Sequence, residues 1–249
     1  MKALIEKKLD EIEQKENVKI LHCVESGSRA WGFASPDSDY DVRFIYLRPK
    51  DFYLRLDKTR DVIEWQLDET LDINGWDLQK ALRLLYTSNP TLFEWNQSPI
   101  VYRTTEEWQK ISAVVDKFFI QKSGLYHYLS MAKSNYKEYL KGENVRLKKY
   151  FYVLRPILAC KWILDKGTPP PMLFRTLMDN CLDEQLKPAV ENLLKQKMQS
   201  GELNTGKRID IINNYIERNI EELEKIIADC PTQKERSWKQ LNEIFLSLF

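Results

Sequence analysis

A chain of 249 residues is long enough for one large domain or two small ones, each with its own hydrophobic core. Hydrophobic residues make up 43% of the chain and charged residues 30%, which excludes an intrinsically disordered protein. The formal net charge of +1 excludes recruitment of nucleic acid by an overall positive field, so any polyanion would have to bind a local basic patch.

The cysteines and the hydropathy pattern indicate where in the cell the protein is located. Cys23, Cys160, Cys181 and Cys230 are scattered without C-x-x-C spacing, which argues against a zinc site and against a disulfide partner. No apolar run approaches the roughly 20 residues that span a bilayer, and the charged N-terminus lacks the apolar region of a signal peptide. We therefore expect a cytoplasmic protein with no membrane partner.

The first half of the chain alternates between helical and strand patterns. Helical spacing of apolar residues predicts a helix over 2–16, and the apolar, β-branched run 18–25 predicts a strand. Ser26-Gly27-Ser28 ends this strand, and a short helical turn follows. The remaining elements expected in this half are strands over 39–47, 62–67 and 70–73 and helices over 76–87, 90–97 and 105–120.

Beyond residue 121 the sequence shows no convincing strand. Long helices are expected over 122–141, 143–166, 184–199, 206–228 and 234–247, with prolines between several of them. We therefore predict an α+β protein. A small domain with a mixed β-sheet and flanking helices covers 1–120, and an all-helical domain covers 121–249.

Two carboxylates stand at the start of the second predicted strand. Residues i and i+2 of a strand point to the same face, so Asp39 and Asp41 project together, with Tyr40 on the other side. Two anions held so close repel each other, and a divalent cation would neutralise them; a few hard oxygen ligands suit Mg²⁺. Taken alone, the D-x-D spacing is more often a solvated strand end.

A glycine and a serine follow the first predicted strand. A strand that ends in Ser-Gly-Ser and opens a helix presents free backbone N–H groups, which can bind a phosphate. Gly27 allows close approach of the backbone, and the Ser28 hydroxyl is a further donor. Taken alone, Ser28 is better explained as an ordinary helix N-cap.

Together these elements form a longer string, from Gly27-Ser28-Arg29-Ala-Trp-Gly through Ser38-Asp39-Tyr40-Asp41. This string resembles the signature of the DNA polymerase β-type nucleotidyltransferase superfamily, and in detail that of its RlaP-like, RNA-repair-associated members. The segments 72–82 and 152–156 are also similar to that group. The resemblance implies a polymerase β-like palm over 1–120 and a helical domain over 121–249 that closes over the nucleotide.

The resemblance also implies a reaction. A nucleoside triphosphate, ATP being favoured, would place its phosphates on Gly27 and Ser28. Two Mg²⁺ ions, or Mn²⁺ in their place, would bind Asp39 and Asp41 and promote attack of an acceptor hydroxyl on the α-phosphate, with release of pyrophosphate. The acceptor would be an RNA end, a protein side chain or a small molecule, and the RlaP-like resemblance favours RNA.

A third carboxylate is expected on a neighbouring strand, where it would bind metal and accept the proton of the acceptor. Asp72 is our choice because apolar residues surround it in a predicted strand. Asp77 and Glu64 remain alternatives, although Asp77 also suits the first turn of a helix. Arg43 should share the face of Asp41, and pairing with a carboxylate and contact with phosphate are equally good interpretations.

Other basic residues are candidates for the nucleotide. Arg29 flanks the Gly-Ser turn. Lys148, Tyr152 and Arg155 recur at helical spacing on one face, and the resemblance implies that they contact the β- and γ-phosphates. A solvated or packed helix face is the alternative. For the whole chain, the alternatives to an active transferase are an inactive nucleotide-binding regulator and a module that only binds other proteins.

Overall fold

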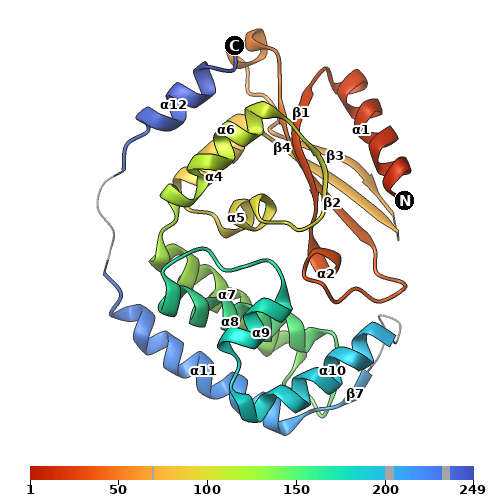
Figure 1. Ribbon diagram of the computed structural model, residues 1–249, viewed down its shortest axis with the longest axis vertical. Coiled ribbons are helices and arrows are strands. Elements are labelled where there is room, and N and C mark those ends of the chain that lie inside the picture. Colours follow the sequence, from red (N-terminus) through yellow and green to blue (C-terminus); the bar gives the residue numbers. More distant parts are fainter. Residues whose placement is uncertain (69, 200–204, 232–235) are drawn as a thin grey trace. The chain divides into compact units, whose positions relative to one another are not determined.

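The computed structural model describes residues 1–249 except 69, 200–204 and 232–235 (Figure 1). Its elements are α1 (Lys2–Glu16), β1 (Lys19–Glu25), α2 (Gly27–Ala30), β2 (Tyr40–Leu47), α3 (Lys50–Tyr53), β3 (Val62–Leu67), β4 (Leu71–Asp77), α4 (Leu78–Tyr86), α5 (Pro90–Asn96), β5 (Val101–Thr104), α6 (Glu106–Val115), α7 (Gln121–Tyr139), β6 (Asn144–Arg146), α8 (Lys149–Lys166), α9 (Phe174–Cys181), α10 (Lys187–Gln199), β7 (Thr205–Lys207), α11 (Asp210–Ala228) and α12 (Lys239–Leu246).

The described chain divides into two compact units. The first unit contains residues 1–30, 39–118 and the C-terminal residues 236–249, and the second contains 31–38 and 119–231. The break after residue 118 lies close to the predicted boundary at 120. Two segments, 31–38 and 236–249, belong to the unit on the other side of that boundary. The unit to which a segment belongs depends on its contacts with distant parts of the chain. Local sequence patterns do not reveal these contacts.

The first unit is built on a five-stranded mixed sheet with the order β3-β4-β2-β1-β5. Strands β2 and β4 run parallel, and the other neighbouring pairs are antiparallel. Helix α1 covers one face of the sheet and α4, α5 and α6 lie on the other side (Figure 1). The fold is therefore α+β with a mixed sheet, as the sequence predicts.

The alternation of side chains along the strands assigns each residue to a face. Apolar residues of α1, including Ile5 and Leu9, pack with Val42, Phe44 and Ile73 in one buried cluster. Because successive side chains of a strand point to opposite faces, Asp41, Arg43 and Asp72 lie on the face away from α1. The polar groups of the predicted site thus share one face of the sheet.

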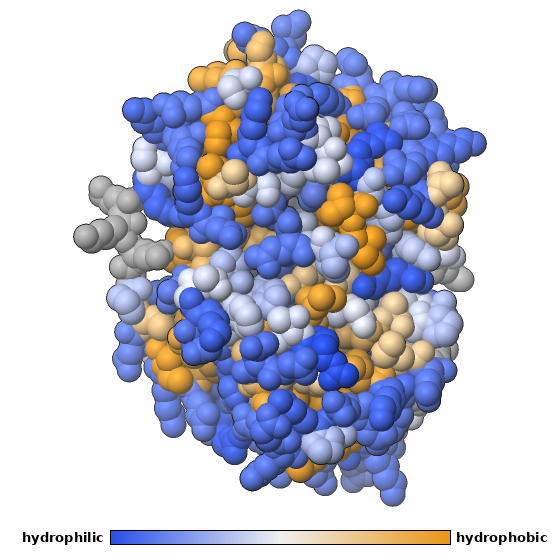
Figure 2. Space-filling view, in the orientation of Figure 1, coloured by the Kyte–Doolittle hydropathy of each residue, from blue (hydrophilic) through white to orange (hydrophobic). Residues whose placement is uncertain are grey.

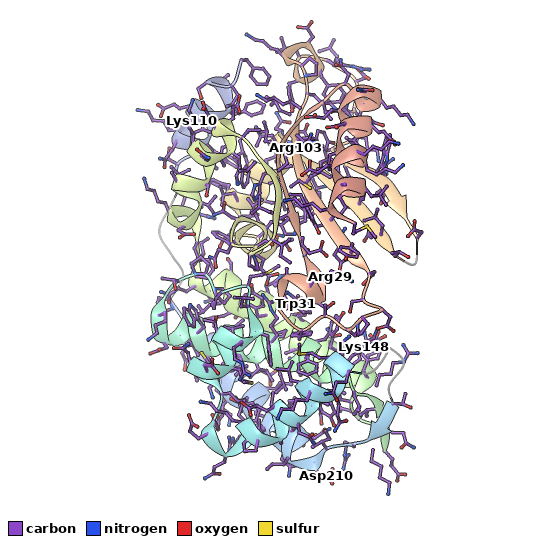
Figure 3. All side chains as sticks on the ribbon, turned by 45° about the vertical axis from the view of Figure 1, so that its right-hand side comes forward. Arg29, Trp31, Arg103, Lys110, Lys148 and Asp210 are labelled. Atoms are coloured by element: carbon purple, nitrogen blue, oxygen red, sulfur yellow. The ribbon has the colours of Figure 1, made fainter. Side chains whose placement is uncertain are left out.

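An arginine on the edge strand β5 ties α1 to the sheet. The Arg103 guanidinium pairs with Glu6, Asp10 and Glu13, with N–O distances of 3.0, 2.7 and 2.9 Å. Figure 3 shows Arg103 beside α1. Strand β5 has only four residues, and the sequence pattern did not predict it.

The second unit is a helical assembly with one small ribbon. Helices α7 and α8 pack along each other, and α11 contacts both. The ribbon consists of β6 and β7, which pair antiparallel with Val145 opposite Gly206. The prediction of an all-helical second domain was wrong in this respect. Strands of three residues are too short to produce a readable alternation in the sequence.

The face shown in Figure 2 is largely hydrophilic, with hydrophobic residues in separate patches. In the described part of the chain, no helix is long and apolar enough to cross a membrane.

Candidate active site

The Gly-Ser turn packs directly against one of the predicted carboxylates. Gly27 follows β1 with a φ of +58°, a left-handed conformation that favours glycine. The Ser26 N–H donates to the Asp41 carbonyl over 2.8 Å, which joins the turn to the start of β2. A Cβ atom on Gly27 would lie 1.9 Å from Asp41 Oδ2. Only glycine therefore allows this carboxylate its observed position.

The parallel pairing of β2 and β4 brings two carboxylates together. Asp41 lies opposite Asp72 in the register of these strands. Both carboxylates accept hydrogen bonds from the same atom, Nη2 of Arg43, over 2.9 Å from Asp41 Oδ1 and 2.6 Å from Asp72 Oδ2. Their side chains are 24% and 25% exposed, so solvent reaches them. The first unit thus contains a half-buried pair of carboxylates that both bind the Arg43 guanidinium.

The two alternatives to Asp72 have other roles in the structure. Asp77 is buried and caps α4, where its Oδ1 accepts from the Gln79 N–H over 2.7 Å. Its Oδ2 accepts from the Tyr53 hydroxyl over 2.8 Å, and burial raises the pKa of Asp77. Glu64 is exposed and pairs with Arg60. Of the three candidates, Asp72 is the one beside Asp41.

The remaining polar residues of the motif surround the start of β2. Asp39 directly precedes this strand, and its carbonyl accepts from Arg29 Nε over 3.0 Å. The Arg29 guanidinium stacks on the Tyr40 ring, 3.7 Å from its centre, and Figure 3 shows Arg29 on α2. Ser28 is 7% exposed. Within the described residues, no three His, Cys, Asp or Glu side chains form a ready-made metal cluster.

Glu25 is a residue of this site that the sequence interpretation missed. It is fully buried at the end of β1. Its Oε1 accepts from the Asp41 N–H over 2.8 Å, and its Oε2 accepts from the Tyr102 hydroxyl. Burial raises the pKa of Glu25. The sequence could have indicated this role, because Glu25 places a carboxylate at the end of an apolar strand, directly before Ser-Gly-Ser.

The middle of the motif is packed inside the second unit. The Trp31 ring lies 5.4 Å from that of Tyr152 in an edge-to-face arrangement, and the Arg155 guanidinium lies 4.8 Å from the centre of the same indole. Further along, Lys197 Nζ donates to Ser35 Oγ over 2.6 Å at a buried position. Residues 31–38 therefore take their packing from the helices, although they link two parts of the sheet unit.

The predicted phosphate ligands of the second unit differ in accessibility. Lys148 and Tyr152 are partly exposed, and Lys149 Nζ lies over the rings of Tyr139 and Tyr152, 3.8 and 4.8 Å from their centres. Arg155 is 1% exposed, and its Nη2 faces the Met172 carbonyl at 3.5 Å. That Lys148, Tyr152 and Arg155 bind nucleotide stays a prediction, and the burial of Arg155 also gives it a packing role.

A groove between α7 and α11 is lined by several lysines and glutamates. Its volume is about 800 Å³. The charged residues that line it are Lys133, Lys137, Lys141, Glu217, Glu221 and Glu224. Because the two signs are equal in number, the groove has no strongly positive field for a polyanion.

Comparison with known proteins identifies the class to which this chain belongs. The model of the RlaP family, described as the RNA repair pathway DNA polymerase beta family, matches residues 1–247. Because this match covers nearly the whole chain, the protein belongs to the RlaP family. Family membership points to a polymerase β-type nucleotidyltransferase.

Two known proteins are similar to this chain. The chain is 46% identical over 252 residues to the uncharacterized protein YcgL of Bacillus subtilis (strain 168), covering 99% of this chain and 96% of that protein. A nucleotidyltransferase-like protein from Exiguobacterium sibiricum 255-15, known from a crystal structure, aligns with 92% of this chain and 74% of its own. The sequence identity to that protein is 13% and the TM-score is 0.32.

Proposed function

We propose that the protein transfers a nucleoside monophosphate from a nucleoside triphosphate, ATP being favoured, to the hydroxyl of an RNA end. The observation that carries this proposal is the contact of Gly27 with Asp41, together with the pairing of Asp41 and Asp72 across two parallel strands. The Gly27-Ser28 turn thus lies against the carboxylate pair, where it could bind a phosphate. The family description supports RNA as the acceptor.

The residues of the site fit a divalent cation. Asp41 and Asp72 already converge on a single positive group, and their oxygens are the hard ligands that Mg²⁺ prefers. Asp39, Asp41 and Asp72 would hold Mg²⁺ or Mn²⁺, and triphosphate oxygens and waters would complete the coordination. A bound ion would neutralise phosphate charge and lower the pKa of the acceptor hydroxyl.

The chain's own groups have separate parts in the reaction. Gly27 and Ser28 bind phosphate through backbone N–H groups, and Arg29 supplies a positive charge beside them. The acceptor oxygen forms a bond to the α-phosphorus, and the bond from that phosphorus to the bridging oxygen breaks, so that pyrophosphate leaves. Asp72, whose Oδ2 accepts from Arg43, would take the proton of the acceptor at Oδ1.

Glu25 has a supporting part in this proposal. Its hydrogen bond from the Asp41 N–H orients the backbone of a residue that would bind the metal. The Tyr102 hydroxyl holds Glu25 in turn. Such a second layer of hydrogen bonds keeps a ligand in one orientation.

The experiment that tests the proposal uses each of the four nucleoside triphosphates labelled at the α-phosphate. The protein is incubated with Mg²⁺ and one donor, alone, with total RNA and with a protein extract. The Asp39→Ala/Asp41→Ala double variant is the control. Transfer of label to RNA that the double variant does not perform would support the proposal.

Each other outcome contradicts part of the proposal. Label on protein would replace RNA by a protein side chain as the acceptor. Label on RNA that persists in the double variant would place the chemistry elsewhere in the chain. Nucleotide binding without any transfer, in the presence of RNA and protein extracts, would favour an inactive nucleotide-binding regulator.

A further inference from the structure

Arg43 bridges the two carboxylates of the Asp41–Asp72 pair. It stands two residues after Asp41 on β2, on the same face of the sheet. Its Nη2 is 2.9 Å from Asp41 Oδ1 and 2.6 Å from Asp72 Oδ2. A single guanidinium nitrogen thus bridges two carboxylates from neighbouring parallel strands.

Backbone groups hold the guanidinium independently of the carboxylates. Arg43 Nη1 donates to the Val42 carbonyl over 3.1 Å and to the Asp72 carbonyl over 3.0 Å. The ladder between β2 and β4 positions both carbonyls. The arginine side chain is 18% exposed, and a guanidinium stays charged at every physiological pH. The positive charge beside Asp41 and Asp72 is therefore a permanent part of the sheet.

This charge changes what the site can bind. Asp39, Asp41 and Asp72 contribute three negative charges beside the buried carboxyl group of Glu25, whereas Arg29 and Arg43 contribute two positive charges. The two arginines therefore offset much of the negative charge that would attract divalent ions. A triphosphate adds the missing negative charge when it binds.

We propose that Arg43 is the resident counter-cation of the Asp41–Asp72 pair, and that it makes metal binding depend on the nucleotide. The protein then binds free divalent ions weakly and takes its metal together with the triphosphate. This proposal rests on the function proposed above and adds an order of binding to it. Arg43 is a positioning residue, since it acts through Asp41 and Asp72.

The test is the affinity of the full-length protein for Mn²⁺, measured by the electron paramagnetic resonance signal of free Mn²⁺. Titrations are made without nucleotide and with an α,β-methylene nucleoside triphosphate, which cannot be cleaved at the α-phosphate. After the Mn²⁺ bound by the analogue alone is subtracted, the analogue should tighten Mn²⁺ binding to the wild-type protein by more than about tenfold. Equal affinity in both titrations would overturn the proposal without any variant.

Arg43→Gln removes the charge and keeps a shorter side chain that can still form hydrogen bonds. Without nucleotide, this variant should bind Mn²⁺ at least about tenfold more tightly than the wild-type protein, because two carboxylates lose their counter-cation. Arg43→Lys keeps the charge and should stay close to the wild type. A gain of affinity is diagnostic, since a residue that only supports the fold would lower metal affinity when removed.

Asp41→Asn separates failure of this inference from failure of the proposed function. If Asp41→Asn abolishes nucleotide-dependent Mn²⁺ binding while Arg43→Gln gains nothing, Arg43 is not the counter-cation and the metal site stands. If Asp41→Asn leaves Mn²⁺ binding unchanged, the metal does not bind this pair, and both proposals fail. Circular dichroism and urea unfolding verify that each variant is folded.

Discussion

Replacing Gly27 by alanine should disable the site while leaving most of the fold intact. The new Cβ atom would lie 1.9 Å from Asp41 Oδ2, whereas real Cβ atoms essentially never approach another atom closer than 3.0 Å. The obstacle is the end of a flexible side chain, so Asp41 can rotate away. Its carboxylate must then move by more than about 1 Å and leave its present position beside Arg43.

The expected magnitudes differ between stability and activity. Alanine at a φ of +58° costs about 1–2 kcal/mol of folding free energy. A displacement of about 1 Å in a reacting group costs about 100-fold in rate. Gly27→Ala should therefore lower kcat by about 100-fold or more while the protein still folds at 25 °C.

Gly32→Ala is a matched control for this variant. Gly32 also has a positive φ, +85°, but a Cβ there would meet only Leu173 Cδ2, at 3.2 Å. Both variants are compared by urea unfolding and by transfer of α-labelled nucleotide to the acceptor that the wild-type protein labels. A similar loss of stability with activity lost only in Gly27→Ala is expected. Activity of Gly27→Ala above half that of Gly32→Ala would refute the reasoning.

Three further predictions test other parts of the structure. His22 is buried, which lowers its pKa from 6.5 to about 4, so the unfolded chain binds a proton over this range that the folded protein does not. The free energy of unfolding should fall by about 3 kcal/mol from pH 6.5 to pH 4. In urea titrations at several pH values, His22→Gln should show a smaller fall. An equal fall in the variant would contradict this prediction. Arg155→Ala should lower the free energy of unfolding by about 3 kcal/mol, because it removes a buried side chain that stacks on Trp31. A loss below about 1 kcal/mol would argue against that packing. Asp72→Asn should reduce transfer by about 100-fold or more, whereas Glu64→Gln should retain it; the reverse ranking in the same labelling assay would reassign the third carboxylate.

The local pattern of apolar and polar residues was sufficient to predict many of the helices and strands of the first unit. The alternation and apolar runs around β1 and β2 predicted those strands, because one or both faces of each strand are buried in the same core. Gly27, Asp39 and Asp41 stand within fifteen residues of one another, so a motif could reveal them. The strands β5, β6 and β7 have three or four residues, which is too few for a periodic signal.

Pairings between distant segments determined the rest of the site, and sequence spacing cannot express them. Asp72 stands beside Asp41 because β4 joins β2 in parallel, whereas Asp77, five residues further on, caps a helix. Glu25 and Arg43 acquire their roles only when the sheet brings the Asp41 N–H and the Asp72 carboxylate to them. The sequence alone therefore determined the class of chemistry, since that depends on residue types in a short motif. The tertiary structure decided the partners of each charged group, because strand register and burial fix those distances.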